Sequence, residues 1–249
     1  MKKDGKKKKG IVYRFLANIV KLFYKKREFI GIENLPNEPT VIVGNHAQIH
    51  GPLACELYFP TKKRIWCIGN MMHLKEVPSY AYEDFWSMKP KWIRWFFKIV
   101  SYLIAPFSVF VFKNADVIGV YKDARLIHTY RESMDYINEG NNIIIFPENR
   151  NEYNEIINEF QDKYIDLAKL YYSKYKICLS FTPMYNAARI KKIVIGKPIY
   201  YDPSISIEEQ RKIINDYLKE QITILAKQLP KHRVVPYINV SKRKEKYNK

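Results

Sequence analysis

Three short groups of polar residues each follow an apolar run in this chain, and their types suit proton transfer and anion binding. The groups are Asn45 and His46 after residues 40–43, Lys122 after residues 117–121, and Pro147, Glu148 and Arg150 after residues 142–146. A base, an acidic group and cations together suit the deprotonation of a hydroxyl on a phosphorylated substrate. We therefore take these residues as the candidates for a reaction of that class.

The element that presents His46 is predicted to be a buried strand. Residues 40–43 are a short β-branched run, which suits a strand covered on both faces, and Gly44 ends it. His46 then lies just past the carboxyl end of the strand, where open α/β sheets place their ligands. Pro52 predicts a loop at residues 46–51 and a helix at residues 52–58. The alternative is that His46 is a core histidine on a connecting loop.

Further apolar runs alternate with helical patterns along the chain. We predict strands at residues 64–68, 117–121, 142–146, 179–185 and 192–195, and helices at residues 123–138, 156–175 and 207–228, the last opened by a capping box at 206–209. This alternation predicts an α/β fold with a mostly parallel central sheet flanked by helices. The carboxyl ends of parallel strands meet at one edge, so the candidate residues are expected to converge there.

The first 27 residues combine a lysine-rich tail with a basic amphipathic helix that precedes the sheet. Ile11, Phe15, Ile19 and Phe23 recur every four residues, and basic residues occupy much of the remainder. Such a helix suits a membrane surface, where lysines meet anionic lipid; the alternative is a helix docked on its own domain. We expect this membrane-surface segment at 1–27, an α/β domain at 28–240 and a disordered basic tail at 241–249.

The formal net charge of +18 indicates an anionic partner: nucleic acid, anionic lipid or a phosphorylated substrate. The sequence contains no recognisable RNA- or DNA-binding motif, and its basic residues concentrate beside an apolar stripe, so nucleic acid is not expected. The length of 249 residues allows one large domain or two small ones, and no linker in the sequence requires two. The three scattered cysteines form no metal-binding pattern, and Cys55 and Cys67, which lie in apolar contexts, are expected to be reduced core residues of a cytoplasmic protein.

The most apolar stretch covers residues 96–112 and suits either a core or a segment that enters the membrane surface. No run of about 18 uncharged apolar residues is present, and Pro106 interrupts the nearest approach. A conventional membrane-spanning helix is therefore not expected. A signal peptide is not expected either, because Arg14 and Lys21 lie within the apolar part of the N-terminus.

The order of four blocks resembles that of the glycerolipid acyltransferases, the lysophosphatidic acid acyltransferase family. The blocks are Asn45-His46 with Gly51-Pro52, residues 118–122, residues 146–148, and Thr182-Pro183, so the resemblance spans residues 30–199. It implies a glycerol-3-phosphate acyltransferase-like fold. It also implies transfer of an acyl group from acyl-CoA or acyl carrier protein to a hydroxyl of a lysophospholipid or glycerol phosphate. The protein would act in phospholipid biosynthesis, peripherally on the cytoplasmic face of the cell membrane, without a cofactor besides the acyl donor.

The resemblance also implies a role for each candidate residue by its position in a block. His46 would be the general base. Three residues would bind the acceptor, and three would position the loops: Lys122, Glu148 and Arg150 for the acceptor, and Asn45, Gly51 and Pro147 for the loops.

Two positions depart from the family pattern. Gly51 stands where the family has the aspartate that orients the imidazole, and Arg150 comes one residue early. Disabling such an orienter in a serine protease costs on the order of 10⁴ in rate. A backbone carbonyl can also orient the ring, or another carboxylate, for which the candidates are Glu56, Asp116, Asp123 and Asp162. The alternative function is therefore a catalytically impaired relative that binds lipid or a membrane partner.

The spacing of His46 and His50, four residues apart, is also that of the two histidines in some zinc-binding helices. Gln48 supplies no carboxylate between them, and Gly51-Pro52 opposes a helix through both histidines. No metal is therefore expected.

Overall fold

The computed structural model describes residues 9–87, 89–149, 156–238 and 245–249. The chain divides into two compact units. The first comprises Met1–Tyr24 and Cys67–Thr129, and the second comprises Lys25–Trp66 and Tyr130–Lys249. The single domain expected at residues 28–240 thus includes segments of both units.

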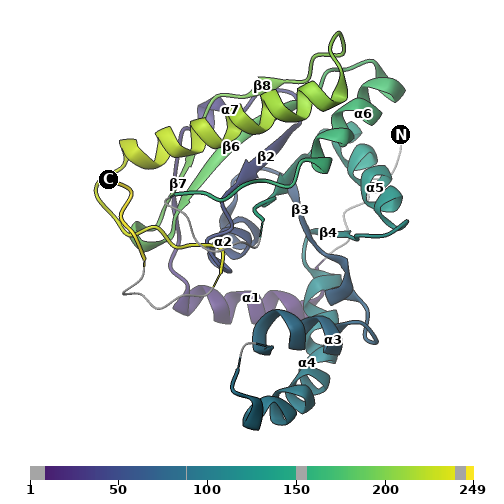
Figure 1. Ribbon diagram of the computed structural model, residues 1–249, viewed down its shortest axis with the longest axis vertical. Coiled ribbons are helices and arrows are strands. Elements are labelled where there is room, and N and C mark those ends of the chain that lie inside the picture. The colour runs from purple at the N-terminus through teal and green to yellow at the C-terminus, as the bar shows by residue number, and fades with distance from the viewer. Residues whose placement is uncertain (1–8, 88, 150–155, 239–244) are drawn as a thin grey trace. The chain divides into compact units, whose positions relative to one another are not determined.

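The second unit is built on a mixed sheet (Figure 1). Its strands are β1 (Glu28–Ile30), β2 (Thr40–Gly44), β3 (Lys63–Ile68, of which the last two residues belong to the first unit), β5 (Asn142–Ile145), β6 (Ser180–Ala187), β7 (Lys192–Ile195) and β8 (Ile199–Tyr200). Their order is β1-β7-β6-β2-β5-β3, with β8 paired to β6. β2 pairs in parallel with β5 and β6, β3 with β5, and β1 with β7, whereas β6 is antiparallel to β7 and β8. The predicted mostly parallel sheet is confirmed.

β2 is the buried strand that the β-branched run predicted. Val41, Ile42 and Val43 are fully buried, as expected for a strand with neighbours on both sides and packing on both faces. Val43 lies opposite Ile145 of β5 and Pro183 of β6. The chain therefore leaves β2 beside the end of β5, whereas β6 continues to Ala187.

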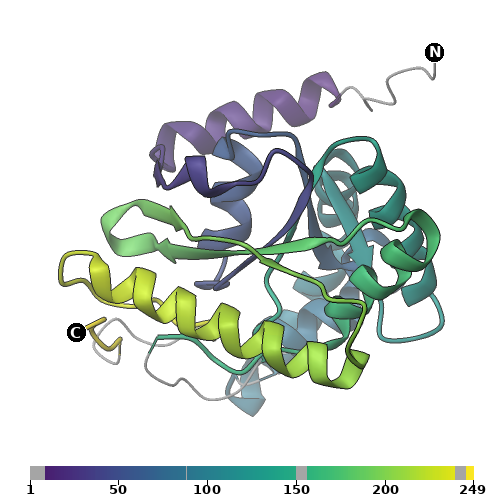
Figure 2. The ribbon, with the colours of Figure 1, turned by 90° about the horizontal axis from the view of Figure 1, so that it is seen from above.

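The helices are α2 (His50–Tyr58), α5 (Leu126–Asn138, whose first four residues belong to the first unit), α6 (Asp166–Tyr175) and α7 (Ile207–Gln228), with short 3₁₀ turns at Ile32–Asn34, Lys163–Ile165 and Ala188–Ile190. Figure 2 shows α7 lying along β6 on one face of the sheet. Ser206 caps α7 as predicted, since its side chain accepts a hydrogen bond from the Glu209 N–H at 3.2 Å. The helices flanking the sheet complete the expected α/β fold.

Three local predictions differ from the structure. β8 was not predicted, and α2 begins at His50 rather than at Pro52. The helix predicted for residues 156–175 exists only from Asp166, after the 3₁₀ turn. Its first part is instead held in an irregular conformation by residues 147–149: Gln161 N–H donates to the Pro147 carbonyl at 2.8 Å, and Asn149 N–H donates to Glu159 at 2.7 Å. Pairing with a distant segment has overridden the local helical pattern.

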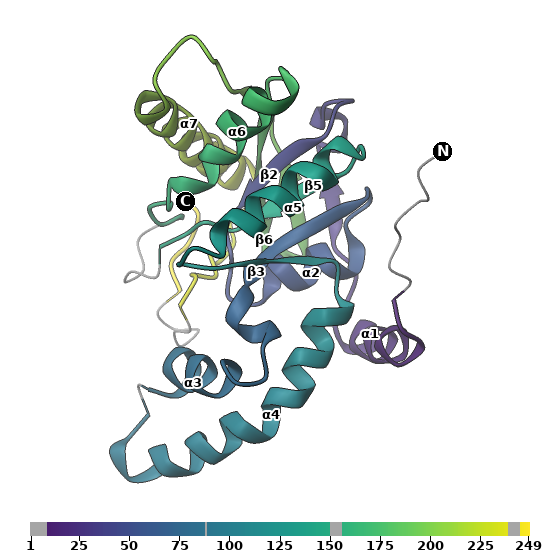
Figure 3. The same cartoon turned by 90° about the vertical axis from the view of Figure 1, so that its right-hand side faces the viewer.

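The first unit contains α1 (Ile11–Phe23), α3 (Val77–Ala81), α4 (Arg94–Asn114) and β4 (Val117–Val120), with short turns at Gly69–Met72, Tyr82–Trp86 and Lys91–Ile93. Figure 3 shows α3 packed beside α4. The core between them consists of Met71, Val77, Ala81 and Ala105.

α4 corrects the expectation for the apolar stretch. It continues through Pro106, which is exposed on the helix surface, so the lost backbone hydrogen bond lies on the outer side. Within the described residues, Lys91–Asn114 is the one segment long and apolar enough to cross a membrane by length and composition. Three residues of α4 are buried, namely Ser101, Ala105 and Ser108, and the helix contacts α3 and the turns at Gly69–Met72, Tyr82–Trp86 and Lys91–Ile93.

Candidate active site

The site forms because β2 and β5 are neighbours in the parallel sheet. Their carboxyl ends carry His46 and Glu148, and the backbone N–H of His46 donates to Oε2 of Glu148 at 2.5 Å. The other carboxylate oxygen, Oε1, accepts from the N–H of Asn158 at 3.3 Å. Glu148 therefore joins the histidine loop to the segment after β5, and the expected convergence of these two candidates is seen.

Burial controls the charge of Glu148. The side chain is 5% exposed, and desolvation raises the pKa of its carboxyl to about 7, against the opposing effect of the hydrogen bonds from His46 and Asn158. The carboxyl is thus poised to gain or lose a proton near neutral pH.

The imidazole of His46 is oriented by a backbone carbonyl. Its Nδ1 is hydrogen-bonded to the carbonyl oxygen of Gln48, which can only accept, so Nδ1 carries the proton and Nε2 is the acceptor nitrogen. The rings of Phe146 and Tyr237 lie edge-on to the imidazole, with centroids 5.6 and 4.6 Å away. Burial lowers the pKa of His46 to about 4, although the bond to Gln48 acts in the other direction. The imidazole is therefore neutral at pH 7.

Three of the four carboxylates that were candidates to orient the ring form ion pairs elsewhere. The pairs are Glu56 with Lys63 at 2.8 Å, Asp116 with Lys9 at 3.0 Å, and Asp123 with Arg125 at 2.8 Å. The fourth, Asp162, precedes the 3₁₀ turn before α6. Of the alternatives left open by the sequence, the structure selects the backbone carbonyl.

Asn45 extends the strand pairing past the end of β2. It is 2% exposed; its Oδ1 accepts from the N–H of Asn186 at 2.6 Å, and its Nδ2 donates to the Asn186 carbonyl at 3.2 Å. The side chain thus replaces a backbone partner for β6, which fixes where the histidine loop begins.

Gly51 and Pro147 also lie where loops are held closely. A Cβ added at Gly51 would lie 2.8 Å from the His46 carbonyl oxygen and 2.8 Å from the Phe146 ring. The backbone therefore occupies the space that an aspartate side chain at this position would need. Pro147 is buried, and its carbonyl accepts from Gln161.

Two candidates are not brought to His46 by these contacts. Lys122 is exposed in the first unit, two residues after the end of β4. Arg150 lies outside the described residues. That both face an acceptor phosphate stays a prediction. Thr182 and Pro183, the fourth block, are buried within β6, where the Thr182 hydroxyl meets that of Thr40 at 2.8 Å.

Three residues of the site were not predicted from the sequence: Gln48, Asn158 and Tyr237. Gln48 and Asn158 act through backbone groups, which side-chain patterns do not reveal. Tyr237 follows α7 and carried no motif. Its aromatic ring was the one available signal, but this chain contains 20 tyrosines, so that signal was not selective.

His50 opens α2 in a cationic environment. Desolvation and the charges of Arg27 and Arg189 lower its pKa, with Glu245 opposing them. Among the described residues, no group of three or more histidine, cysteine or acidic side chains is arranged to hold a metal ion.

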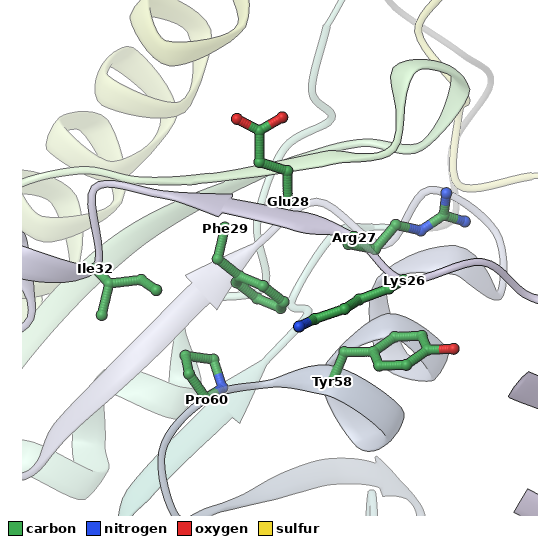
Figure 4. Close-up of a pocket in the computed structure, with 7 residues that line it drawn as sticks. All are labelled: Lys26, Arg27, Glu28, Phe29, Ile32, Tyr58 and Pro60. Atoms are coloured by element: carbon green, nitrogen blue, oxygen red, sulfur yellow. The ribbon is translucent and has the colours of Figure 1, made fainter. Parts of the chain in front are cut away.

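A separate cavity of about 590 Å³ lies beside β1 (Figure 4). It is lined by Lys26, Arg27, Glu28, Phe29, Ile32, Tyr58 and Pro60. Figure 4 shows Lys26 extending beside the Phe29 ring, with Glu28 on the opposite side of the strand. None of the candidate catalytic residues lines this cavity.

The resemblance of this chain to known proteins is found in structure and not in sequence. No family model matches the chain, and no curated protein sequence matches it. The chain is similar in structure to the crystal structure of the 1-acyl-sn-glycerophosphate (LPA) acyltransferase PlsC from Thermotoga maritima, with 12% sequence identity and a TM-score of 0.47. The alignment covers 86% of this chain and 78% of that chain. The class established here is a mixed α/β protein with a mostly parallel, helix-flanked sheet.

Proposed function

We propose that this protein is a membrane-associated acyltransferase of phospholipid biosynthesis. It would move a fatty acyl group from acyl-CoA or acyl carrier protein to a hydroxyl of a lysophospholipid or glycerol phosphate. The observation that carries the proposal is the arrangement of His46. Its imidazole is neutral and donates the Nδ1 proton in a hydrogen bond to the Gln48 carbonyl, and its backbone N–H donates to Glu148. The order of the four sequence blocks supports the same reaction.

In the proposed reaction, Nε2 of His46 accepts the proton of the acceptor hydroxyl while the oxygen attacks the thioester carbonyl. The tetrahedral intermediate collapses, the carbon–sulfur bond breaks, and the thiolate takes the proton from the imidazolium. The products are an oxygen ester and a free thiol. Lys122 and Arg150 would face the acceptor phosphate, and Glu148 would lie beside the acceptor while it holds the His46 loop.

The low pKa of His46 has a consequence for rate. The base form is fully present at pH 7, but an imidazole with a pKa of about 4 has little driving force to accept a proton. A carbonyl also offers no negative charge to stabilise the imidazolium, unlike an aspartate. We therefore expect slower turnover than in a protein with a carboxylate-paired histidine.

The protein would bind the membrane through the exposed apolar surfaces of α1 and α4. On α1 the exposed apolar side chains are Ile11, Val12, Phe15, Ile19, Val20, Leu22 and Phe23. On α4 and the turn before it they are Trp92, Trp95, Phe96, Ile99, Tyr102, Leu103 and Phe107. No acidic residue occurs at positions 5–27 or 85–115, so both segments suit anionic lipid. The location would be the cytoplasmic face of the cell membrane.

An assay of thiol release tests the reaction. Purified protein is given acyl-CoA or acylated carrier protein with lysophosphatidic acid or glycerol 3-phosphate. We expect acceptor-dependent thiol release that His46→Ala reduces by about 10²-fold or more. His128→Ala, at an exposed position, is the matched control and should retain the activity. Thiol release that is insensitive to His46→Ala would exclude the role given to this residue.

A second candidate is a relative that has lost catalysis and binds lipid or a membrane partner. The absence of an aspartate at position 51 and the depressed pKa of His46 favour it. The same thiol-release assay separates the two candidates. Acceptor-dependent turnover that Glu148→Gln or His46→Ala abolishes would exclude this second candidate.

Vesicle flotation tests the membrane partner. Replacing Phe15 and Phe23 by serine should reduce flotation with anionic vesicles, whereas Ile177→Ser, at an exposed position 51% accessible to solvent, should not. Tight, salt-sensitive binding to DNA without vesicle binding would refute the membrane assignment.

A further inference from the structure

The loop that carries His46 has a backbone conformation that its own residues disfavour. Ala47 and Gln48 have φ values of 47° and 55°, in the left-handed region, and neither is a glycine. This conformation turns the Gln48 carbonyl back toward Nδ1 of His46, two residues earlier. The orientation of the imidazole therefore depends on whatever holds these two residues in place.

The C-terminal segment contacts all three residues of this loop. The Pro236 carbonyl accepts from the N–H of Gln48 at 3.1 Å. Val235 is buried against Ala47 in a small cluster completed by Ala188. Tyr237 lies edge-on to the His46 ring. Backbone, apolar and ring contacts thus come from three consecutive residues of one segment.

This segment is itself fixed to the body of the second unit. Nε2 of His232 is hydrogen-bonded to the hydroxyl of the buried Tyr185 at 2.9 Å. The N–H of Val234 donates to the Lys246 carbonyl at 2.8 Å, and the Asn248 side chain donates to the carbonyl of Ala226 in α7 at 2.7 Å. Because these contacts anchor the segment independently of the His46 loop, the segment can hold the strained loop in place.

We propose that Val235, Pro236 and Tyr237 are the positioning residues of His46: they hold Ala47 and Gln48 in the left-handed conformation that places the Gln48 carbonyl on Nδ1. This inference rests on the proposed function only for the role of His46 as a base. The crowded surroundings of Gly51 leave no space for a side chain that could orient the imidazole. The C-terminal segment orients the imidazole instead, through the Gln48 carbonyl. The segment lies outside all four sequence blocks.

The test is a double variant, Val235→Ala with Tyr237→Ala, in the full chain. The matched control is Ile177→Ala with Tyr200→Ala, which removes one aliphatic and one aromatic side chain at exposed positions. Nitrogen NMR of ¹⁵N-histidine-labelled protein, with His46→Gln to assign the signals, reports which ring nitrogen carries the proton. We expect one Nδ1–H tautomer in the wild type and in the control, and a mixture of tautomers in the double variant.

The loss of the Nδ1–H tautomer in the NMR spectrum should be accompanied by a loss of turnover. We expect kcat to fall about tenfold or more in the double variant, with the KM for the acceptor within about twofold of the wild type. Adding Gln48→Gly to the double variant should restore the Nδ1–H tautomer and most of kcat, because glycine adopts the left-handed conformation without steric strain and retains the carbonyl. A general loss of folding would not be rescued in this way.

The outcomes separate this proposal from the proposed function. An unchanged Nδ1–H tautomer in the folded double variant overturns the positioning role, whether or not the wild type transfers acyl groups. A double variant that unfolds and is not rescued by Gln48→Gly also overturns it. A tautomer shift that Gln48→Gly reverses, in a wild type without acyl transfer, supports the positioning role and refutes the proposed function.

Discussion

At the scale of single residues, His46 and Glu148 are neighbours whose pKa values are displaced in opposite directions by the same cause. Burial disfavours charge on both, so it lowers the pKa of the imidazole to about 4 and raises that of the carboxyl to about 7. Around pH 5.5 the site thus holds a neutral base beside a neutral acid. Each shift is linked to folding, because the unfolded chain titrates at ordinary values.

The two linkages have opposite signs between pH 4.5 and pH 6.5. The folded carboxyl keeps a proton that the unfolded one loses, so Glu148 makes the free energy of unfolding fall as the pH rises. The imidazole of His46 binds a proton in the unfolded chain but not in the folded one, so His46 makes the free energy of unfolding rise as the pH rises. Each slope is about 1.4 kcal/mol per pH unit, and in the wild type they offset each other.

Single substitutions should expose each slope. Relative to the wild type, the free energy of unfolding of Glu148→Gln should rise with pH over this range, and that of His46→Gln should fall. Urea unfolding at several pH values measures both differences, and groups common to both proteins cancel. Flat differences for both variants would contradict the assigned pKa directions.

Gly51 gives a second prediction at this scale. Gly51→Ala should destabilise the protein by about 1–3 kcal/mol, because the new methyl group must displace the His46 carbonyl or the Phe146 ring. Gly51→Asp should destabilise it at least as much and should not raise activity. In the control Gly10→Ala, the methyl meets the flexible Asn114 side chain at 3.2 Å, so the loss should be smaller. A stable, more active Gly51→Asp would show that the loop has room for the missing orienter.

At the scale of elements, α7 is the helix whose start was best determined by local sequence. Ser206→Ala should lower the free energy of unfolding by about 1 kcal/mol, since the Glu209 N–H loses its partner at the end of the helix. Ser206→Asp keeps an acceptor oxygen and should be close to the wild type. Chemical denaturation compares the two variants, and equal losses would mean that the cap contributes nothing.

At the scale of the whole molecule, the excess of 43 basic over 25 acidic residues and the exposed apolar side chains of α1 and α4 suit one partner surface. Flotation with anionic vesicles should fall severalfold when the salt is raised from 0.1 to 1 M, because the Debye length shrinks from about 10 to about 3 Å. Flotation with neutral vesicles should be weaker and insensitive to salt. Equal binding to both vesicle types at all salt concentrations would assign the attachment to the apolar faces alone.

Much of the fold was readable from the sequence because it depends on local pattern. The β-branched run of β2, the capping residue of α7 and the amphipathic period of α1 each predicted the correct element. The meeting of His46 and Glu148 followed from strand ends in a parallel sheet. The helix predicted at residues 156–161 does not form, because hydrogen bonds to the Pro147–Asn149 backbone outweigh helix propensity there.

By itself the sequence determined the class of fold, the strand that presents His46, and the partner of that loop across the sheet. Only the tertiary structure decided how the imidazole is oriented and where the C-terminal residues lie. Residues 245–249, expected to belong to a disordered tail, instead bury Glu245 and Asn248. The physical reason is that these features depend on backbone carbonyls and on packing between segments remote in sequence, and neither leaves a periodic pattern in the order of side chains.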